Sequence, residues 1–317
     1  MSAHRDREEE PEMTETPPNP HALDQPEEAE QPRVLGQPQA DKLLQAASRA
    51  PVVLVAIDQD DSSSAVLGTG VQFAEMIGAA VEALHAGTSL PAPLCMLARR
   101  QGVSLRRVDG PATRALVAQL ERPEVRGIVV GAGLGRSGHH PVGPTTRYVA
   151  ERSGKSVVIV PASARGEGGP LRHLLVPLEG TEASSRPILE ALLPLIVTGA
   201  EVEVLHVFTE ETLPRMLDHP VQDLELLGRE FLAKHCPGAS RILLRAGPVA
   251  DRVREVCDEG RCDMIVLSWS QVSAVGRARV VRDVLSTSAI PVLLLPVGAD
   301  EGPTALPDAA SQWAPWN

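Results

Sequence analysis

The stretch PVVLVAID, residues 51–58, returns later in the chain as HLLVPLE, residues 173–179. Each copy is a short apolar run, rich in β-branched residues or leucine, that is followed by an acid, Asp58 in the first copy and Glu179 in the second. Such a run, without polar alternation, is typical of a strand buried on both faces of a parallel sheet. The two copies therefore predict that one strand-forming unit occurs twice in the chain.

The repeat continues beyond these first strands. The two acids are 121 residues apart, and after an insertion rich in helix formers in the second copy the spacing becomes 137. Stretches of helical periodicity lie between the apolar runs, so we expect strand and helix to alternate in each copy. Three further pairs of runs occur in the same order: VEALH (81–85) and VEVLH (202–206), IVVG (128–131) and IVLS (265–268), SVVIVP (156–161) and PVLLLP (291–296).

The repeated order predicts two tandem doubly wound α/β domains. Alternating buried strands and helices give a parallel sheet with helices on both sides. We expect five strands in each copy in the order 3-2-1-4-5, so that the carboxyl ends of strands one and four flank the ligand crevice. In the first copy the expected strands are 52–57, 81–85, about 103–108, 127–131 and 156–160. The predicted boundaries are a tail at 1–48, domains at 49–168 and 169–299, and a C-terminal tail at 300–317.

Charge and composition restrict the classes of partner. The formal net charge is −11, and residues 1–40, with seven prolines and few large apolar side chains, contribute −7 of it. We expect this acidic tail to be disordered. The rest is nearly balanced and the chain is 2% aromatic, which disfavours nucleic acid. No apolar run reaches the roughly 18 residues of a membrane span, and the four cysteines lack disulfide or metal spacing, so a cytoplasmic protein without metal is expected.

A glycine-rich loop, GAGLGRSGHHPVGPTT (131–146), follows the fourth strand of the first copy. The backbone N–H groups of such a loop can approach a phosphate, and the following helix adds its positive end. Gly133 to Gly138 fit the dinucleotide pattern, but the loop follows the fourth strand rather than the first, and HHPVGP interrupts the helix. A P-loop is excluded, because His139 and His140 stand where Lys-Ser or Lys-Thr is required.

Over both copies the chain resembles the universal stress protein family. The resemblance rests on the first strand ending at Asp58, the VEALH strand, Gly110-Pro111 before a helix, and the loop after the fourth strand. Members that bind ATP carry G-x2-G-x9-G-[S/T] in this loop. Here Gly133 and Gly143 keep the nine-residue spacing, but only one residue separates Gly131 from Gly133, and Pro144 replaces the closing Ser or Thr.

The resemblance implies a stress-response or regulatory protein, not an enzyme, with a weak site for ATP or a related adenine nucleotide in the first domain. Proline suits the first helical position, but it removes one N–H that a terminal phosphate would use. The nucleotide-binding residues carried over are Asp58, Gly131, Gly133, Gly143, Thr145 and Thr146.

The second copy departs further from the family pattern. Its loop, SWSQVSAVGRARVVRD (268–283), retains only Gly276, and Trp269 is expected to fill space that a phosphate would need. We expect no ATP there and a scaffold role for this domain. Arg277, Arg279 and Arg282 near the start of the last helix leave two interpretations open, an anion site or a solvated basic rim.

Two alternatives to a nucleotide sensor remain at this stage. One is a protein-interaction module without nucleotide that acts through its tails or its pseudo-dimer surface. The other is an enzyme, but the sequence shows no nucleophile paired with a base, and the recurrence of His85 and His206 is interpreted as shared packing. Members of the family pair through their fifth strands, so SVVIVP and PVLLLP predict an intramolecular pseudo-dimer, with further dimerisation open.

Overall fold

The computed structural model describes residues 50–133, 142–164, 170–180, 182–208, 221–260, 262–269 and 277–296. The tails predicted at 1–48 and 300–317 lie outside these residues, and the domain boundaries stay a prediction. Within the described residues, no helix is both long enough and apolar enough to cross a bilayer.

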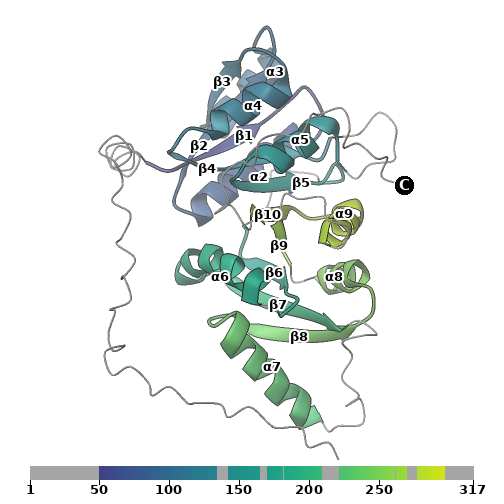
Figure 1. The fold of residues 1–317 in the computed structure, drawn as a ribbon. Helices are drawn as coiled ribbons and strands as arrows, with labels where there is room; N and C mark the ends of the chain where they lie inside the picture. The colour runs from purple at the N-terminus through teal and green to yellow at the C-terminus, as the bar shows by residue number, and fades with distance from the viewer. Residues whose placement is uncertain are drawn as a thin grey trace, which may run out of the picture. The chain divides into compact units, whose positions relative to one another are not determined.

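Strands and helices alternate in both halves of the chain (Figure 1). The first half contains β1 (Val52–Ala56), α2 (Ser63–Met76), β2 (Ala80–Ala86), α3 (Ala92–Arg100), β3 (Ser104–Val108), α4 (Ala112–Leu120), β4 (Val125–Gly131), α5 (Pro144–Arg152) and β5 (Ser156–Val160). The second half contains β6 (His173–Pro177), α6 (Glu182–Val197), β7 (Glu201–Phe208), α7 (Val221–His235), β8 (Arg241–Ala246), α8 (Val249–Asp258), β9 (Met264–Trp269), α9 (Arg277–Thr287) and β10 (Val292–Pro296).

The ten strands form one sheet in the order β3-β2-β1-β4-β5-β10-β9-β6-β7-β8. Each half therefore has the predicted order 3-2-1-4-5, and the prediction of two doubly wound units is confirmed. Neighbouring strands within each half run parallel, whereas β5 and β10 pair antiparallel, with Val158 opposite Leu293. The predicted pairing of the fifth strands within one chain is thus confirmed, and it joins the two halves edge to edge.

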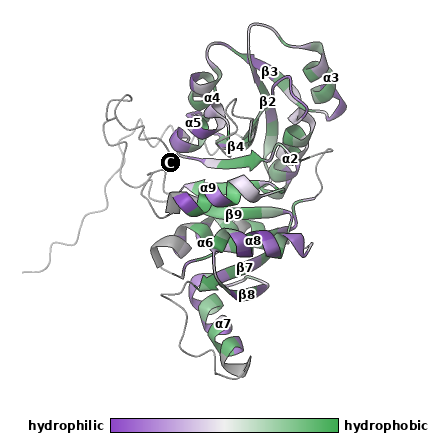
Figure 2. Cartoon of the chain, turned by 90° about the vertical axis from the view of Figure 1, so that its right-hand side faces the viewer, coloured by the Kyte–Doolittle hydropathy of each residue, from purple (hydrophilic) through white to green (hydrophobic). Residues whose placement is uncertain are grey.

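Each central strand is buried on both faces. In β1, Val53 and Val55 belong to the core on one side of the sheet and Leu54 to the core on the other, and all three are fully buried. This double burial explains the apolar run without polar alternation. The first core takes side chains from α2, α3, α6 and α7, and the second from α4, α5, α8 and α9. In Figure 2 the strand β9 is mainly hydrophobic, whereas the side of α8 that faces the viewer is mainly hydrophilic.

Helix α2 lies close against β1. A side chain at Gly70 would overlap Val55, so the fold requires a glycine there for close approach. This contact holds α2 against β1, and the hydrogen bonds between Ser63 and the Asp58 backbone join the start of the helix to the end of the strand.

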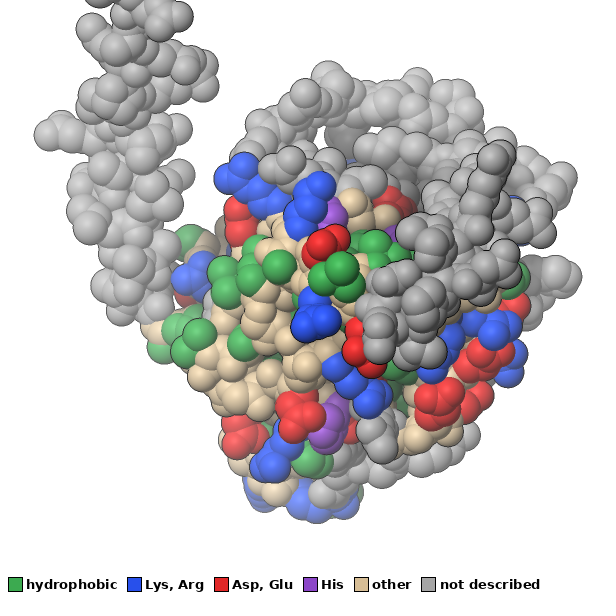
Figure 3. Space-filling view, turned by 90° about the horizontal axis from the view of Figure 1, so that it is seen from below, with side chains coloured by type: hydrophobic (Ala, Val, Ile, Leu, Met, Phe, Trp, Pro, Cys, Tyr) green, Lys and Arg blue, Asp and Glu red, His purple; other side chains and the backbone are tan. Residues whose placement is uncertain are grey.

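Charged side chains of both signs are interspersed on the face shown in Figure 3. Elsewhere among the described residues, Arg106 and Arg122 pair with Glu82, Arg241 with Glu203, and Arg186 with Glu190. The described residues drawn on the face of Figure 3 form no continuous basic stripe of the kind that nucleic acid requires.

Candidate functional site

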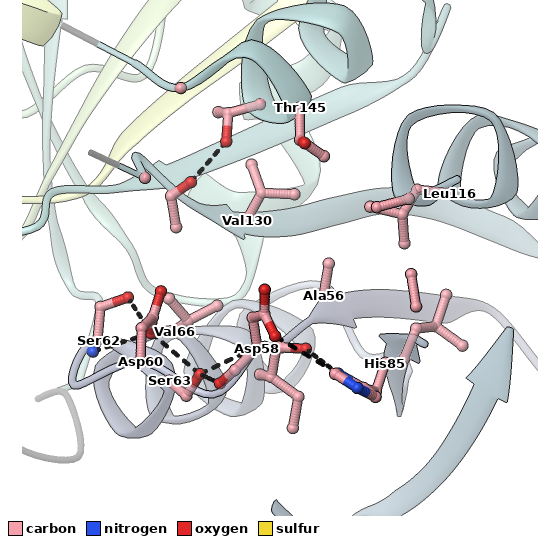
Figure 4. Close-up of a pocket in the computed structure, with 18 of the residues that line it drawn as sticks. Ala56, Asp58, Asp60, Ser62, Ser63, Val66, His85, Leu116, Val130 and Thr145 are labelled. Atoms are coloured by element: carbon pink, nitrogen blue, oxygen red, sulfur yellow. Dashed lines mark hydrogen bonds and ion pairs between the residues drawn. The ribbon is translucent and has the colours of Figure 1, made fainter. Parts of the chain in front are cut away.

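A cavity of about 260 Å³ lies at the carboxyl ends of β1 and β4, at the crevice that the strand order predicts (Figure 4). All six residues expected from the sequence line it: Asp58, Gly131, Gly133, Gly143, Thr145 and Thr146. The other lining residues are Ala56, Ile57, Asp60, Ser62, Ser63, Val66, Leu84, His85, Ala86, Ala112, Leu116, Val130 and Pro144. The structure therefore brings the predicted residues together, while their binding role stays a prediction.

One wall of the cavity carries carboxylates. Asp58 follows β1, and its backbone is held by Ser63, whose hydroxyl donates to Asp58 O and accepts from Asp58 N–H at 3.1 Å. The Asp58 carboxylate accepts from Gln59 N–H at 2.8 Å, and its side chain is 78% exposed. The chain therefore fixes the backbone of Asp58 and leaves carboxylate lone pairs for donors on a ligand.

Asp60 belongs to the same wall and was missed by the sequence reasoning. Its Oδ1 accepts from Ser62 N–H at 3.1 Å and from the Ser62 hydroxyl at 2.8 Å, as in an Asx turn. The signal was present, since an acid two residues before a serine at a strand-to-helix junction is typical of such a turn. Much of the hydrogen-bonding capacity of Asp60 thus serves the turn itself.

The opposite wall is the first turn of α5. Gly143 is the N-cap and Pro144 the first helical residue, as predicted for the proline. The first N–H groups of a helix have no acceptor within it, and Pro144 has none to offer, so Thr145 and Thr146 supply the remaining donors. In Figure 4, Thr145 lies across the cavity from Asp58 and Ser62.

Two groups expected to face a phosphate are engaged by the protein itself. The hydroxyl of Thr146, which is buried, donates to Gly131 O at 2.6 Å. The N–H of Gly143 donates to Ala132 O at 2.6 Å, and this bond closes the base of the loop. Gly133 has a φ of +64°, which requires glycine. Arg136, His139 and His140 lie outside the described residues.

His85 closes the end of the cavity beside β2. It is 5% exposed, and its Nδ1 lies 3.1 Å from Ile57 O. Because a carbonyl only accepts, Nδ1 carries the proton in this contact. The second half repeats the bond, with His206 Nδ1 2.9 Å from Leu178 O. The recurrence of the two histidines is therefore shared packing, as predicted: each ties the second strand to the backbone after the first.

Residues 170–296 match the model of the Universal stress protein family. The match covers the second half of the repeat, from β6 to β10. The protein of unknown function from Pseudomonas aeruginosa PAO1 has a similar structure, with 16% identity over 80% of this chain and 95% of its own, and a TM-score of 0.57. A universal stress protein from Archaeoglobus fulgidus DSM 4304 has 15% identity over 79% of this chain and 100% of its own, and a TM-score of 0.56. At these identities the likeness shows the fold alone. No curated protein sequence matches the chain.

The crevice of the half that matches the family model is smaller and is lined mainly by aliphatic side chains. Its volume is about 80 Å³. Ser268 stands where Gly131 stands in the first half, and Val281 in α9 is buried at the position of Thr146 in α5. Val280 therefore corresponds to Thr145. The lining is Pro177, Leu178, Glu179, Leu205, Val207, Val249, Leu267, Ser268, Val280 and Val281.

Two expectations for this domain are resolved by its contacts. The interpretation that Trp269 fills the second crevice is wrong, because its indole N–H donates to Ala150 O of α5, in the first half, at 3.2 Å. Arg279 and Arg282 share one acid of the same helix, Asp283, which lies within 4 Å of each, and this contact favours a rim over an anion site. Among the described residues, no group of His, Cys, Asp and Glu side chains is arranged to hold a metal ion.

Proposed function

We propose that the first half is a second universal stress protein domain and that its crevice binds an adenine nucleotide. The chain would then be a tandem regulatory protein of the cytoplasm, with one weak nucleotide site and a scaffold domain. The observation that carries the proposal is the convergence of all six expected residues on one cavity between β1 and β4.

The two walls of the cavity carry the two kinds of polar group that a nucleotide requires, acceptors on one wall and donors on the other. Asp58 offers lone pairs to sugar hydroxyls or to an amine of the base, and the first turn of α5 offers N–H groups to an anion. Apolar side chains of Leu84, Leu116 and Val130 lie between these walls and suit the faces of a base. The two polar walls would orient the ligand with its phosphate toward α5.

The affinity is expected to be low. A hydrogen bond to a charged group contributes roughly 1.5–3 kcal/mol, and Pro144 removes one such donor. The Thr146 hydroxyl and the Gly143 N–H are committed to Gly131 O and Ala132 O. The cavity, at about 260 Å³, also lies just below the 300–1,000 Å³ common for ligand sites. A site with this number of donors fits a sensor of abundant nucleotide better than a tight store.

Binding without chemistry is part of the proposal. Among the described residues that line the cavity, the one histidine, His85, uses Nδ1 on a backbone carbonyl, and the lining contains neither cysteine nor lysine. Such a set supplies no nucleophile activated by a base. Ligand occupancy, rather than turnover, would be the signal that other proteins read.

The test compares equivalent acids in the two halves. Isothermal calorimetry with AMP, ADP and ATP at up to millimolar concentration should detect binding to the full chain, with GTP as the base control. Asp58→Asn should weaken binding about tenfold or more, and Glu179→Gln, at the matching position of the second half, should leave it unchanged. Absence of binding by the wild type, or equal losses in the two variants, would remove the proposal.

A further inference from the structure

One hydrogen bond crosses from the second half to the helix that lines the crevice of the first. Trp269 ends β9, is 9% exposed, and donates its indole N–H to Ala150 O at 3.2 Å. Ala150 lies in the last turn of α5, where carbonyls have no N–H partner within the helix. The indole therefore satisfies a carbonyl that α5 itself leaves open.

Helix α5 is held at both ends by different halves of the chain. Its first turn is fixed by Thr146, whose hydroxyl donates to Gly131 O of the first half. Its last turn is fixed by Trp269 of the second half. The helix has nine residues, and helices this short depend on tertiary contacts for their order. Loss of the hydrogen bond at either end should therefore destabilise the whole of α5.

The first half has a different residue at the position equivalent to Trp269. The residue of the first half that corresponds to Trp269 is Ala132, a small side chain whose backbone N–H donates to Val160 O. Val149 and Ala150 of α5 belong to the same core as Trp269, so the indole is also packed against the helix that it caps. The domain with the small crevice thus uses the strand end beside that crevice to hold α5.

We propose that Trp269 is a positioning residue for the first crevice, through which the second half sets the placement of α5 and hence of the donors of Thr145 and Thr146. The effect on affinity rests on the proposed nucleotide function, whereas the effect on α5 does not. Trp269 acts through the helix, since it is absent from the residues that line the cavity.

The first experiment is hydrogen–deuterium exchange of the full chain without ligand. Trp269→Phe keeps an aromatic ring and removes the N–H. We expect amide exchange across α5 to rise about three- to tenfold, the range of one hydrogen bond of ordinary strength. Thr198→Val is the control on the opposite face of the sheet, because the Thr198 hydroxyl, which donates to Leu195 O at 2.8 Å, also lies 3.4 Å from Met76 O of the other half. It should leave α5 unchanged.

The second experiment keeps the hydrogen bond of Trp269 and measures the fluorescence emission of this residue. The chain has three tryptophans, so Trp313→Phe with Trp316→Phe makes Trp269 the single indole. AMP or ATP added to this variant should shift the emission of Trp269. The same addition should cause no shift when Asp58→Asn is also present.

The outcomes separate the two proposals. Faster exchange in α5 together with an affinity reduced about three- to tenfold in Trp269→Phe supports the positioning role. Unchanged exchange in α5, or faster exchange with unchanged affinity, overturns it. If the wild type binds no nucleotide, the proposed function fails, and faster exchange that reaches the Arg147 amide, which donates to Gly143 O in the first turn, then still supports the placement of α5 by Trp269.

Discussion

The two halves have a crevice at the same place in the fold, but different side chains line it. Both have the strand order 3-2-1-4-5, and both leave a space at the carboxyl ends of their first and fourth strands. In the first half this space is about 260 Å³ and carries hydroxyls, carboxylates and glycines, and in the second it is about 80 Å³ and carries mainly aliphatic side chains. Topology therefore provides the crevice, and a few side chains decide whether it stays open.

The comparison also separates family likeness from the site. The universal stress protein model matches residues 170–296, the half with the small crevice. The half with the larger, polar cavity lies outside that match. A family and its fold do not determine a ligand site, which depends on particular side chains, so the match does not show which of the two halves keeps a site.

The largest effect on stability is expected when a threonine of α5 is replaced by the valine that stands at the same position in the second half. Thr146→Val removes the hydroxyl that donates to Gly131 O and keeps the shape of the side chain. The variant should lose about 1–3 kcal/mol of unfolding free energy, because a partly buried carbonyl loses the hydroxyl that donates to it. Thermal and urea unfolding of the full chain measure this loss.

The matched control is Thr145→Val, one residue earlier. This side chain is half-buried, so the change should stay within about 0.5 kcal/mol in stability. It should instead weaken nucleotide binding, if Thr145 faces the phosphate. Equal destabilisation by the two variants would show that the two hydroxyls are not divided between fold and ligand.

The next effect concerns the donor that Pro144 lacks. Pro144→Ser restores an N–H and a hydroxyl at the first position of α5. We expect nucleotide affinity to rise about tenfold, since a hydrogen bond to an anion contributes roughly 1.5–3 kcal/mol and part is lost in ordering. Calorimetry with AMP and ATP gives the change directly.

Pro144→Ala separates the two groups that serine adds. Alanine restores the N–H alone, so an intermediate affinity assigns part of the gain to the backbone. If neither variant binds more tightly than the wild type, the first turn of α5 does not contact the phosphate, and the polar lining of the first crevice needs another explanation.

The sequence was sufficient for the architecture and for the meeting of distant residues. Asp58 and Gly131 are far apart in the chain, but a 3-2-1-4-5 sheet places the strands that precede them side by side, so their convergence follows from strand order. The predicted strands agree closely as well, with 156–160 identical to β5 and 52–57 one residue longer than β1.

The sequence did not predict which partner each individual side chain contacts. That the Thr146 hydroxyl turns to Gly131 O, and Thr145 to the cavity, depends on the rotamer and entry angle of α5. The direction of Trp269 depends on how the halves meet at β5 and β10, which no local pattern encodes. Residues next to each other in sequence thus serve different purposes that only the packed structure separates.

A smaller effect is expected at the amino ends of the strands, where the comparison is reversed. Here the second half has the open space, a cavity of about 560 Å³ beside Glu203. In the first half Arg122 and Arg106 bind Glu82, and Arg122 also binds Glu124. Burial would raise the pKa of Glu82, but hydrogen bonds and charge from both arginines outweigh it and hold this pKa below its ordinary value of 4.5.

Because the folded pKa of Glu82 is lowered, its contribution to stability is present above about pH 4.5 and is lost as pH falls through the folded pKa. Arg122→Ala should cost about 1 kcal/mol at pH 7 and flatten the loss of stability below pH 4.5. Urea unfolding at pH 7 and pH 4 measures both. Arg186→Ala, in an exposed pair with Glu190, should cost only about 0.3–0.5 kcal/mol. If the stability of Arg122→Ala falls with decreasing pH as steeply as that of the wild type, the pairing of Arg122 with Glu82 does not cause the loss of stability in acid.

The smallest change in stability is expected at Gly143, the N-cap of α5, and it should have the opposite sign to its effect on binding. The backbone there, at φ −67° and ψ 163°, accepts serine, and an added Cβ would meet no atom closer than 3.5 Å. Gly143→Ser should therefore add a few tenths of a kcal/mol, because its hydroxyl can accept from Thr145 or Thr146 N–H. The same bond withdraws a donor from the crevice, so nucleotide affinity should fall about three- to tenfold.

Gly143→Ala adds the Cβ without the hydroxyl and should lower stability slightly, since alanine is a poor N-cap. Thermal unfolding and calorimetry on the two variants should thus give a stability gain with a large affinity loss for serine, and a stability loss with a smaller affinity loss for alanine. Equal affinity losses would mean that the Cβ alone obstructs the ligand. Parallel losses of stability and affinity would mean that the open helix end serves the fold rather than an anion, and the two crevices would then differ in size but not in purpose.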